Sequence, residues 1–370
     1  MHDFDANPGR PPLSRRTLLG LGAATVTGLV LAACGSDGDA SSTAASTTSA
    51  APGTTAATTT TSGAGTTSAA ATTTTAASTP ASAPAALTRT VDTIHGAVEV
   101  PTSPQRVVCL NFVDTATMLD VGIVPVGMAT SGVNFLPEYE SAMANIPQVT
   151  SENALEYQVE LIASLKPDLI IGSDWLAADR QHVPYDQLSA IAPTAICEWQ
   201  QAAGNWPDQA AFFADVVGRT SELDALRSAY EAHADQIKST HAAPLGEYTW
   251  ALIQGGLQSD WYLYTPHSSH GQVFARAGVR FADIASDETG GFVAMSTERI
   301  GDLAAADVLA LNVNVSATAG ADKLKAEALY QTLPAVKNDR VFGMSWFFPS
   351  SYKVADALLG ELDTALGKLA

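Results

Sequence analysis

The sequence predicts an α/β fold of two doubly wound lobes, joined by a single long helix, with a ligand cleft between them. Short apolar runs typical of buried strands alternate with segments of helical spacing before residue 206 and again after residue 241. Between these stretches, residues 206–241 carry apolar side chains at helical intervals and no strand pattern. Strands that alternate with helices indicate parallel sheets covered on both faces. A cleft between two such lobes is a common place for a ligand.

The first lobe, residues 87–205, begins with a run after Pro104 that we interpret as a buried strand. Asp114 is a possible cap for the helix that follows, and Lys166-Pro167 should end a later helix. The expected strands are 106–111, 124–128, 168–172 and 194–197, and the expected helices are 114–121, 156–165 and 187–191.

The connecting helix is expected over 206–241, where Gly218 is the one break and Thr220 a possible restart. The second lobe, residues 242–370, resumes the alternation. Its expected strands are 248–253, 307–311 and 341–344, and its expected helices are 271–277, 296–303 and 352–369.

Residues 1–33 predict a signal peptide, because Arg15-Arg16 precede an uncharged apolar run that is too short to span a membrane. The arginine pair resembles a twin-arginine export signal, and residues 31–34, ending in Cys34, resemble a lipobox, which implies lipid attachment to Cys34. An uncleaved anchor and a secreted protein cut elsewhere are the alternatives. Residues 34–86 are rich in Ala, Thr and Ser, and predict a disordered tether.

The chain of 370 residues carries 19 Lys and Arg against 38 Asp and Glu, for a net charge of −19. This charge argues against a nucleic-acid partner and against adhesion to anionic lipid by charge alone. Three cysteines are too few for a disulfide-built fold. Cys109 and Cys197 fall on separate strands and are expected to be buried free thiols. No phosphate loop, HExxH, CxxC or GxSxG motif occurs, so we expect no enzyme.

From about Thr90 to its end, the chain resembles the iron-siderophore binding proteins of ABC importers, the helix-linked periplasmic class that includes ferrichrome and cobalamin binders. Four segments carry the resemblance: PQRVV at 104–108, VELIASLKPDLII at 159–171, MSTERI at 295–300 and LPAVKNDRV at 333–341.

The resemblance implies a monomeric, lipid-anchored receptor on the outer face of the cytoplasmic membrane. It would hold a ferric siderophore, need no cofactor and deliver its ligand to ABC permease subunits for iron transport. Haem or cobalamin binding, an enzyme on a two-lobed scaffold, and a signalling or wall-associated protein of the same fold are the alternatives.

Two glutamates match positions where this family docks onto permease arginines. They are Glu160, within Val159-Glu160-Leu161, and Glu298, within Ser296-Thr297-Glu298. A partner whose arginines bind one carboxylate on each lobe would contact both lobes at once. The alternative is an ordinary acidic residue in the first turn of a helix.

Ligand-binding residues are expected just after the strands, because ligands of open α/β sheets lie beyond the strands' carboxyl ends. Aromatic side chains there could grip a bulky ferric complex, although some could instead fill the lobe cores. The candidates are Asn111, Phe112, Thr130, Ser131, Asp174, Trp175, Trp199, the 261–270 loop with Tyr264, Phe292, and Trp346 to Phe348; the resemblance favours Trp175, Phe292, Trp346 and Phe348.

Only Arg180 among the arginines closely follows a strand, so the sequence favours a hydroxamate or mixed siderophore over a highly anionic one. The arginine that ferrichrome-type members carry before the first docking glutamate is missing from residues 149–153. If the ligand were haem, Tyr264, His267 or His270 could supply an axial ligand. No metal site formed directly by the protein is otherwise expected.

Overall fold

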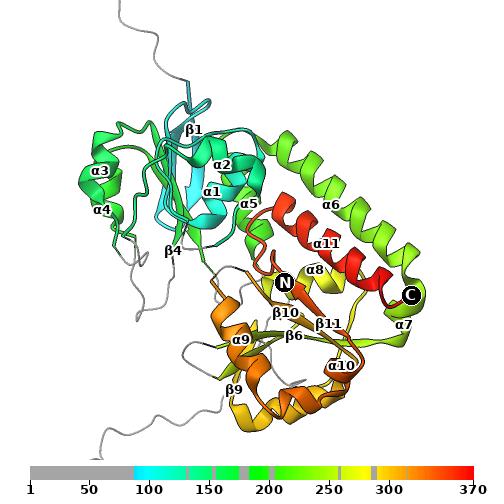
Figure 1. The fold of residues 1–370 in the computed structure, drawn as a ribbon. Helices are drawn as coiled ribbons and strands as arrows, with labels where there is room; N and C mark the ends of the chain where they lie inside the picture. The colour runs from blue at the N-terminus through cyan, green and yellow to red at the C-terminus, as the bar shows by residue number, and fades with distance from the viewer. Residues whose placement is uncertain are drawn as a thin grey trace, which may run out of the picture. The chain divides into compact units, whose positions relative to one another are not determined.

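The computed structural model describes residues 87–130, 133–151, 156–174, 183–199, 205–256, 260–284, 290–314 and 316–370. Within these ranges the strands form three sheets (Figure 1). The predicted signal peptide, the tether and Cys34 lie outside the described residues. None of the helices in the described ranges combines the length and apolar character that a membrane crossing requires.

The first lobe is built on three parallel strands in the order β3 (Val107–Cys109), β4 (Leu169–Asp174) and β5 (Thr194–Glu198). The expected strand at 124–128 is reduced to two isolated bridges, between Val108 and Gly127 and between Met128 and Gln148. Pro125 has no N–H to continue a ladder, which explains the shortening.

A hairpin that the sequence pattern did not indicate precedes this sheet. Its strands are β1 (Thr88–Thr93) and β2 (Gly96–Pro101), paired antiparallel over six residues each. The turn carries His95, whose ring stacks on that of Tyr185 with centroids 3.7 Å apart. The hairpin is thereby fixed to the first lobe.

The second sheet has the order β11-β10-β6-β7-β9 and is mixed. The predicted parallel strands are present as β6 (Thr249–Gly255), β10 (Val308–Asn312) and β11 (Val341–Met344). Two strands absent from the prediction, β7 (Trp261–Tyr264) and β9 (Phe292–Met295), extend it antiparallel, and β8 (Arg280–Phe281) pairs with β6. Residues 256–260 are too few for a parallel crossover, so β7 folds back on β6.

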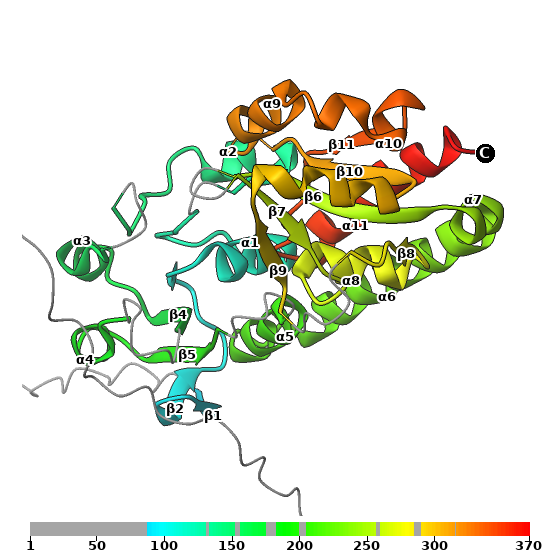
Figure 2. The ribbon, with the colours of Figure 1, turned by 90° about the horizontal axis from the view of Figure 1, so that it is seen from below.

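Helices cover both faces of the first and second sheets (Figure 2). In the first lobe they are α1 (Phe112–Asp120), η1 (Pro137–Tyr139), α2 (Glu140–Met143), α3 (Val159–Ser164) and α4 (Tyr185–Ser189). In the second they are α7 (Ala242–Glu247), α8 (Ser269–Arg276), η2 (Thr297–Ala305), α9 (Thr318–Ala326), η3 (Tyr330–Thr332), α10 (Pro334–Lys337) and α11 (Tyr352–Gly367).

The predicted single helix over 206–241 is two helices, α5 (Trp206–Val216) and α6 (Thr220–Thr240). Gly218, at φ +70°, occupies the left-handed region that a β-carbon disfavours, and this ends α5. Helix α6 lies along α11 and links the two lobes (Figure 1).

Alternate residues of each buried strand enter different cores, as the pleat requires. Trp250 and Leu252 of β6 face one core, whereas Ala251 and Ile253 face another. The first of these cores is continuous from β3 and β4 through α5 and α6 to α11. The two lobes therefore share one apolar interior as well as a linking helix.

Candidate functional site

The carboxyl end of β3 forms one wall of the candidate site through the start of α1. The Asn111 side chain accepts the Val113 N–H at 3.0 Å, and Asp114 accepts the N–H groups of Leu110 and Asn111. Burial raises the pKa of the fully buried Asp114 well above its usual range. This capping box fixes Phe112 as the first residue of the helix.

Two aromatic rings of the first lobe meet at this wall. Phe112 and Trp199, which follows β5, pack edge to face with centroids 5.5 Å apart. They open onto a hollow of about 120 Å³ between the lobes. Its lining includes Phe112, Trp199 and Trp206 on one side and Ser269, Phe348 and Pro349 on the other.

The second lobe presents a larger aromatic wall, centred on Tyr264 at the end of β7. The Tyr264 ring lies 5.8 Å from that of Phe348 and 6.0 Å from that of Phe292, measured between centroids. Tyr262, on the same face of β7, continues the row at 5.6 Å from Phe292. Phe292 is 49% exposed, so this end of the wall is open to solvent.

Polar groups orient Tyr264 from behind. Its hydroxyl donates to Gln254 Oε1 at 3.2 Å, and the same oxygen accepts the Asn312 side-chain amide at 2.7 Å. Burial also raises the pKa of Tyr264, so its hydroxyl stays protonated. The part of the aromatic wall around Tyr264 is therefore uncharged at neutral pH.

His270 lies behind the same wall. Its ring centroid is 4.4 Å from that of Tyr264 and 3.9 Å from that of Phe347, and neither nitrogen bonds to a described residue. Burial lowers the pKa of His270 well below its usual value, which keeps the imidazole neutral. His267 is exposed. A haem-ligand role for either histidine stays a prediction.

Trp346 lies on the other side of Phe348, in a small depression with Val133, Asn134 and Asn314. The Asn134 side-chain amide donates to the Ser345 carbonyl at 3.2 Å. Glu361 of α11 accepts the Ser345 and Trp346 N–H groups. The predicted residues Tyr264, Phe292 and Phe348 thus share one wall, and Trp346 adjoins it.

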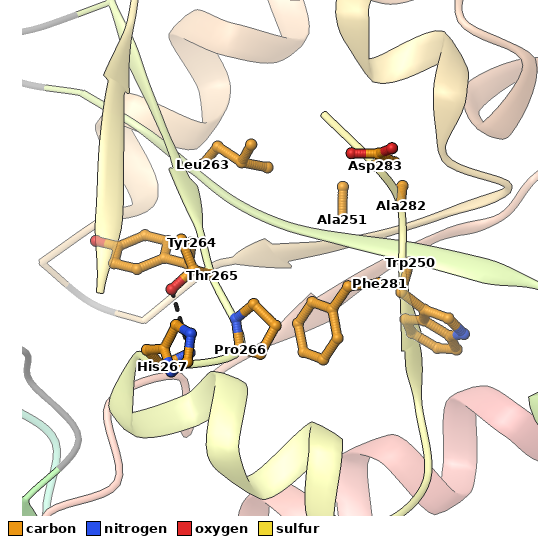
Figure 3. A pocket seen from close by; sticks show the side chains of 10 residues that line it. All are labelled: Trp250, Ala251, Leu263, Tyr264, Thr265, Pro266, His267, Phe281, Ala282 and Asp283. Carbon is orange, nitrogen blue, oxygen red and sulfur yellow. Dashed lines mark hydrogen bonds between the residues drawn. The ribbon is translucent and has the colours of Figure 1, made fainter. Parts of the chain in front are cut away.

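A larger cavity of about 270 Å³ lies within the second lobe, where β7 and β8 end beside β6 (Figure 3). Its lining is Trp250, Ala251, Leu263, Tyr264, Thr265, Pro266, His267, Phe281, Ala282 and Asp283. The described residues of the first lobe contribute nothing to it, so it cannot bring two lobes onto one ligand. We therefore place the candidate site between the lobes despite the smaller volume there.

Several predicted site residues cannot be compared with the structure. Trp175, Arg180 and Ser131 lie outside the described residues.

Glu160 is exposed in the first turn of α3, and Glu298 is exposed in the first turn of η2. Hydrogen bonding from the Ser296 side chain lowers the pKa of Glu298, so this carboxylate is ionised at neutral pH.

Cys109 and Cys197 are free, as expected. Cys109 is buried, but Cys197 is only partly so. Burial raises the pKa of both thiols, which makes them poor nucleophiles and poor metal ligands. Across the described ranges, no cluster of three or more His, Cys, Asp or Glu residues could hold a metal ion.

Sequence reasoning missed Trp206, Asn134 and Glu361. For Glu361 a usable signal existed, since helical spacing places it beside the buried Leu358, Leu362 and Ala365. The sequence pattern places Trp206 in the connecting helix and gives no sign that it lines the cleft. Nothing in the pattern around Asn134 indicates a contact with residue 345.

The periplasmic binding protein family model matches residues 107–345. Among curated proteins, the chain is 36% identical over 155 residues to the probable siderophore-binding lipoprotein YfiY of Bacillus subtilis, covering 41% of this chain and 45% of YfiY. This match therefore spans less than half of that relative. The chain is 26% identical over 256 residues to the Fe(3+)-citrate-binding protein YfmC of B. subtilis, covering 69% and 78%.

A solved structure with a similar fold is the siderophore periplasmic binding protein from the fuscachelin gene cluster of Thermobifida fusca. It has a TM-score of 0.64 and 24% identity, and the match covers 73% of this chain and 98% of that one. At this identity the likeness concerns the fold alone.

Proposed function

Because this chain belongs to the periplasmic binding protein family, we propose that it captures a ferric siderophore outside the cytoplasm and delivers it to an ABC permease for iron uptake. The aromatic wall of Tyr264, Phe292 and Phe348 carries the proposal. Flat apolar rings hold a bulky complex by area and shape. The described residues offer no metal cluster of their own, which suits a chelate that brings its own oxygen ligands to iron.

The chemistry of the hollow supports a siderophore of low charge. The described residues that line it include aromatic rings and the amides of Asn205 and Gln209, but neither Arg nor Lys. Arg180, which lies outside the described residues, would bring only one positive charge to a trianionic catecholate complex. We therefore propose a hydroxamate or mixed siderophore, with Trp175 and Arg180 as further contacts.

Ferric citrate is the second candidate, since the relative YfmC is named for it. Titration followed by tryptophan fluorescence distinguishes a hydroxamate or mixed siderophore from ferric citrate. Trp199, Trp206 and Trp346 border the cleft, so a bound ligand should quench their emission. The purified chain would be titrated with ferrichrome, ferrioxamine B, ferric citrate, ferric enterobactin, haem and cobalamin. We expect saturable quenching by a ferric hydroxamate. A response to haem or cobalamin alone, or to none of the six, contradicts the proposal.

We further propose that Glu160 and Glu298 dock the loaded receptor onto permease arginines. Both are exposed, and each belongs to a helix of a different lobe. Arginine holds exposed carboxylates through paired hydrogen bonds, and such contacts weaken with salt.

Export through the twin-arginine signal and lipid attachment at Cys34 complete the proposed arrangement, with residues 34–86 as the tether. A Cys34→Ala variant should lose the incorporation of labelled fatty acid and leave the membrane fraction. Continued labelling of that variant would contradict the assignment of Cys34.

A further inference from the structure

The segment between β11 and α11, residues 345–351, carries Trp346 and Phe348 to the cleft, whereas Phe347 between them is buried in the core. The segment forms neither helix nor strand. The directions of its aromatic side chains therefore depend on the groups that hold its backbone.

One carboxylate holds the start of this segment. Glu361, two and a half turns into α11, has both oxygens 3.0 Å from the Ser345 nitrogen, and its Oε2 is 3.2 Å from the Trp346 nitrogen. Hydrogen bonds from N–H groups to an ionised acceptor are stronger than those to a neutral one. The Ser345 carbonyl in turn accepts the Asn134 amide of the first lobe. The peptide beside Trp346 is thus fixed from both sides of the cleft.

The protonation state of Glu361 matters for these bonds. Burial raises the pKa of this carboxyl group, and a protonated carboxyl loses part of its acceptor capacity. On the elements around α11, His233 and His241 of α6 bond to Asp356 and Asp363 of α11, Arg276 of α8 bonds to Glu231 and Asp235, and Asp120 of α1 bonds to the Lys353 backbone. Arg227 of α6 bonds to Asp224, His270 of α8 packs against Phe347, and β11 carries no charged residue.

We propose that Glu361 is a positioning residue for the ligand: its ionised carboxylate holds residues 345 and 346 so that Trp346 and Phe348 face the cleft, and its protonation loosens them. The inference rests on the proposed function. It predicts that affinity falls on mild acidification while the fold persists. A carboxyl whose pKa is raised by folding does not lose folding stability when it is protonated.

Binding of ferrichrome and ferrioxamine B tests the inference, measured between pH 7.5 and pH 5 by tryptophan quenching with Tm recorded in parallel. Glu361→Gln should weaken binding at neutral pH about tenfold, the scale of one lost hydrogen bond to a charged group, and should flatten the pH profile. Glu361→Asp keeps the charge and should retain a pH-dependent profile. Asp363→Asn is the control and should match the wild type, because among the described residues this carboxylate of the same helix bonds to His241 and not to residues 345–346.

Amide hydrogen exchange of the ligand-free chain provides a readout that needs no siderophore. The Ser345 and Trp346 amides should exchange about tenfold faster in Glu361→Gln than in the wild type or in Asp363→Asn, as expected when one hydrogen bond to a charged group is lost. Equal exchange overturns the inference, whatever the chain binds. If the wild type binds neither ferrichrome nor ferrioxamine B, but its Ser345 and Trp346 amides exchange more slowly than those of Glu361→Gln, the proposed ligand is wrong and the role of Glu361 stands. Wild-type binding that Glu361→Gln leaves unchanged at every pH also overturns the inference.

Discussion

The two lobes present different surfaces to the cleft. The first lobe offers a capped helix start and the Phe112–Trp199 pair, whereas the second offers Phe348, from which a row of aromatic rings continues through Tyr264 to the exposed Phe292. Apolar contact area is therefore concentrated on the second lobe. The difference suggests that the second lobe supplies most of the binding free energy, and that the first closes the opposite side.

Docking onto the permease should depend equally on both lobes, because Glu160 and Glu298 place one carboxylate on each. The double change Glu160→Ala and Glu298→Ala should abolish siderophore uptake by cells and leave ligand affinity intact. Each single change should reduce uptake in part. Uptake at the wild-type rate by the double variant would refute the docking assignment.

The shared core limits how independent the lobes can be. Leu359→Ala on α11 removes a fully buried side chain from this core and should cost about 2–5 kcal/mol of unfolding free energy, through lost burial and a cavity. Denaturant unfolding should show one transition shifted as a whole. Leu329→Ala, at a 40% exposed position, is the matched control and should change stability by about 0.5 kcal/mol or less. Two separate transitions would contradict the shared core.

Replacing one aromatic ring on each lobe by alanine compares how much each lobe contributes to the free energy of ligand binding. Phe348→Ala should weaken siderophore binding about 30-fold, equivalent to about 2 kcal/mol, as for a central aromatic contact. Phe112→Ala should weaken it only about threefold, as for a contact at the rim of an interface. Fluorescence titration of both variants provides the comparison. Equal losses would mean that the ligand is gripped evenly by both lobes.

The smallest effect is expected at the junction of the lobes. Asp120 of α1 accepts the Lys353 N–H at 3.0 Å and the Tyr139 hydroxyl at 2.7 Å, and burial raises its pKa. Because the folded state holds this proton more tightly than the unfolded state, the wild type gains stability as pH falls from neutral through the raised pKa. Asp120→Asn lacks that gain. Its free energy of unfolding should fall further below that of the wild type between pH 7 and pH 5, by about 1 kcal/mol or less. A constant difference across that range would exclude Asp120 as the titrating group.

The residues explain why some elements could be predicted and others could not. Buried parallel strands such as β4 and β10 are continuous apolar runs, and their sequence pattern is sufficient. The strands β7 and β9 span only four residues each, and pairing with β6 and with each other defines them. Phe348 could be suspected because it follows the predicted strand at 341–344, and Tyr264 because it lies in the 261–270 loop, whereas the family resemblance indicates Phe292. Glu361 could not be paired with Trp346, since their contact depends on how α11 packs against the end of β11.

The continuous interior also bears on how such a receptor could change its cargo during evolution. Most side chains of the shared core, such as Leu252 and Leu359, do not line the hollow, although Val113 and Trp206 belong to both. Substitutions at the cleft rim can therefore alter which chelate fits, while the frame that presents the two glutamates proposed for docking keeps its geometry. A receptor built this way can acquire a new iron source without having to evolve a new contact with its transporter.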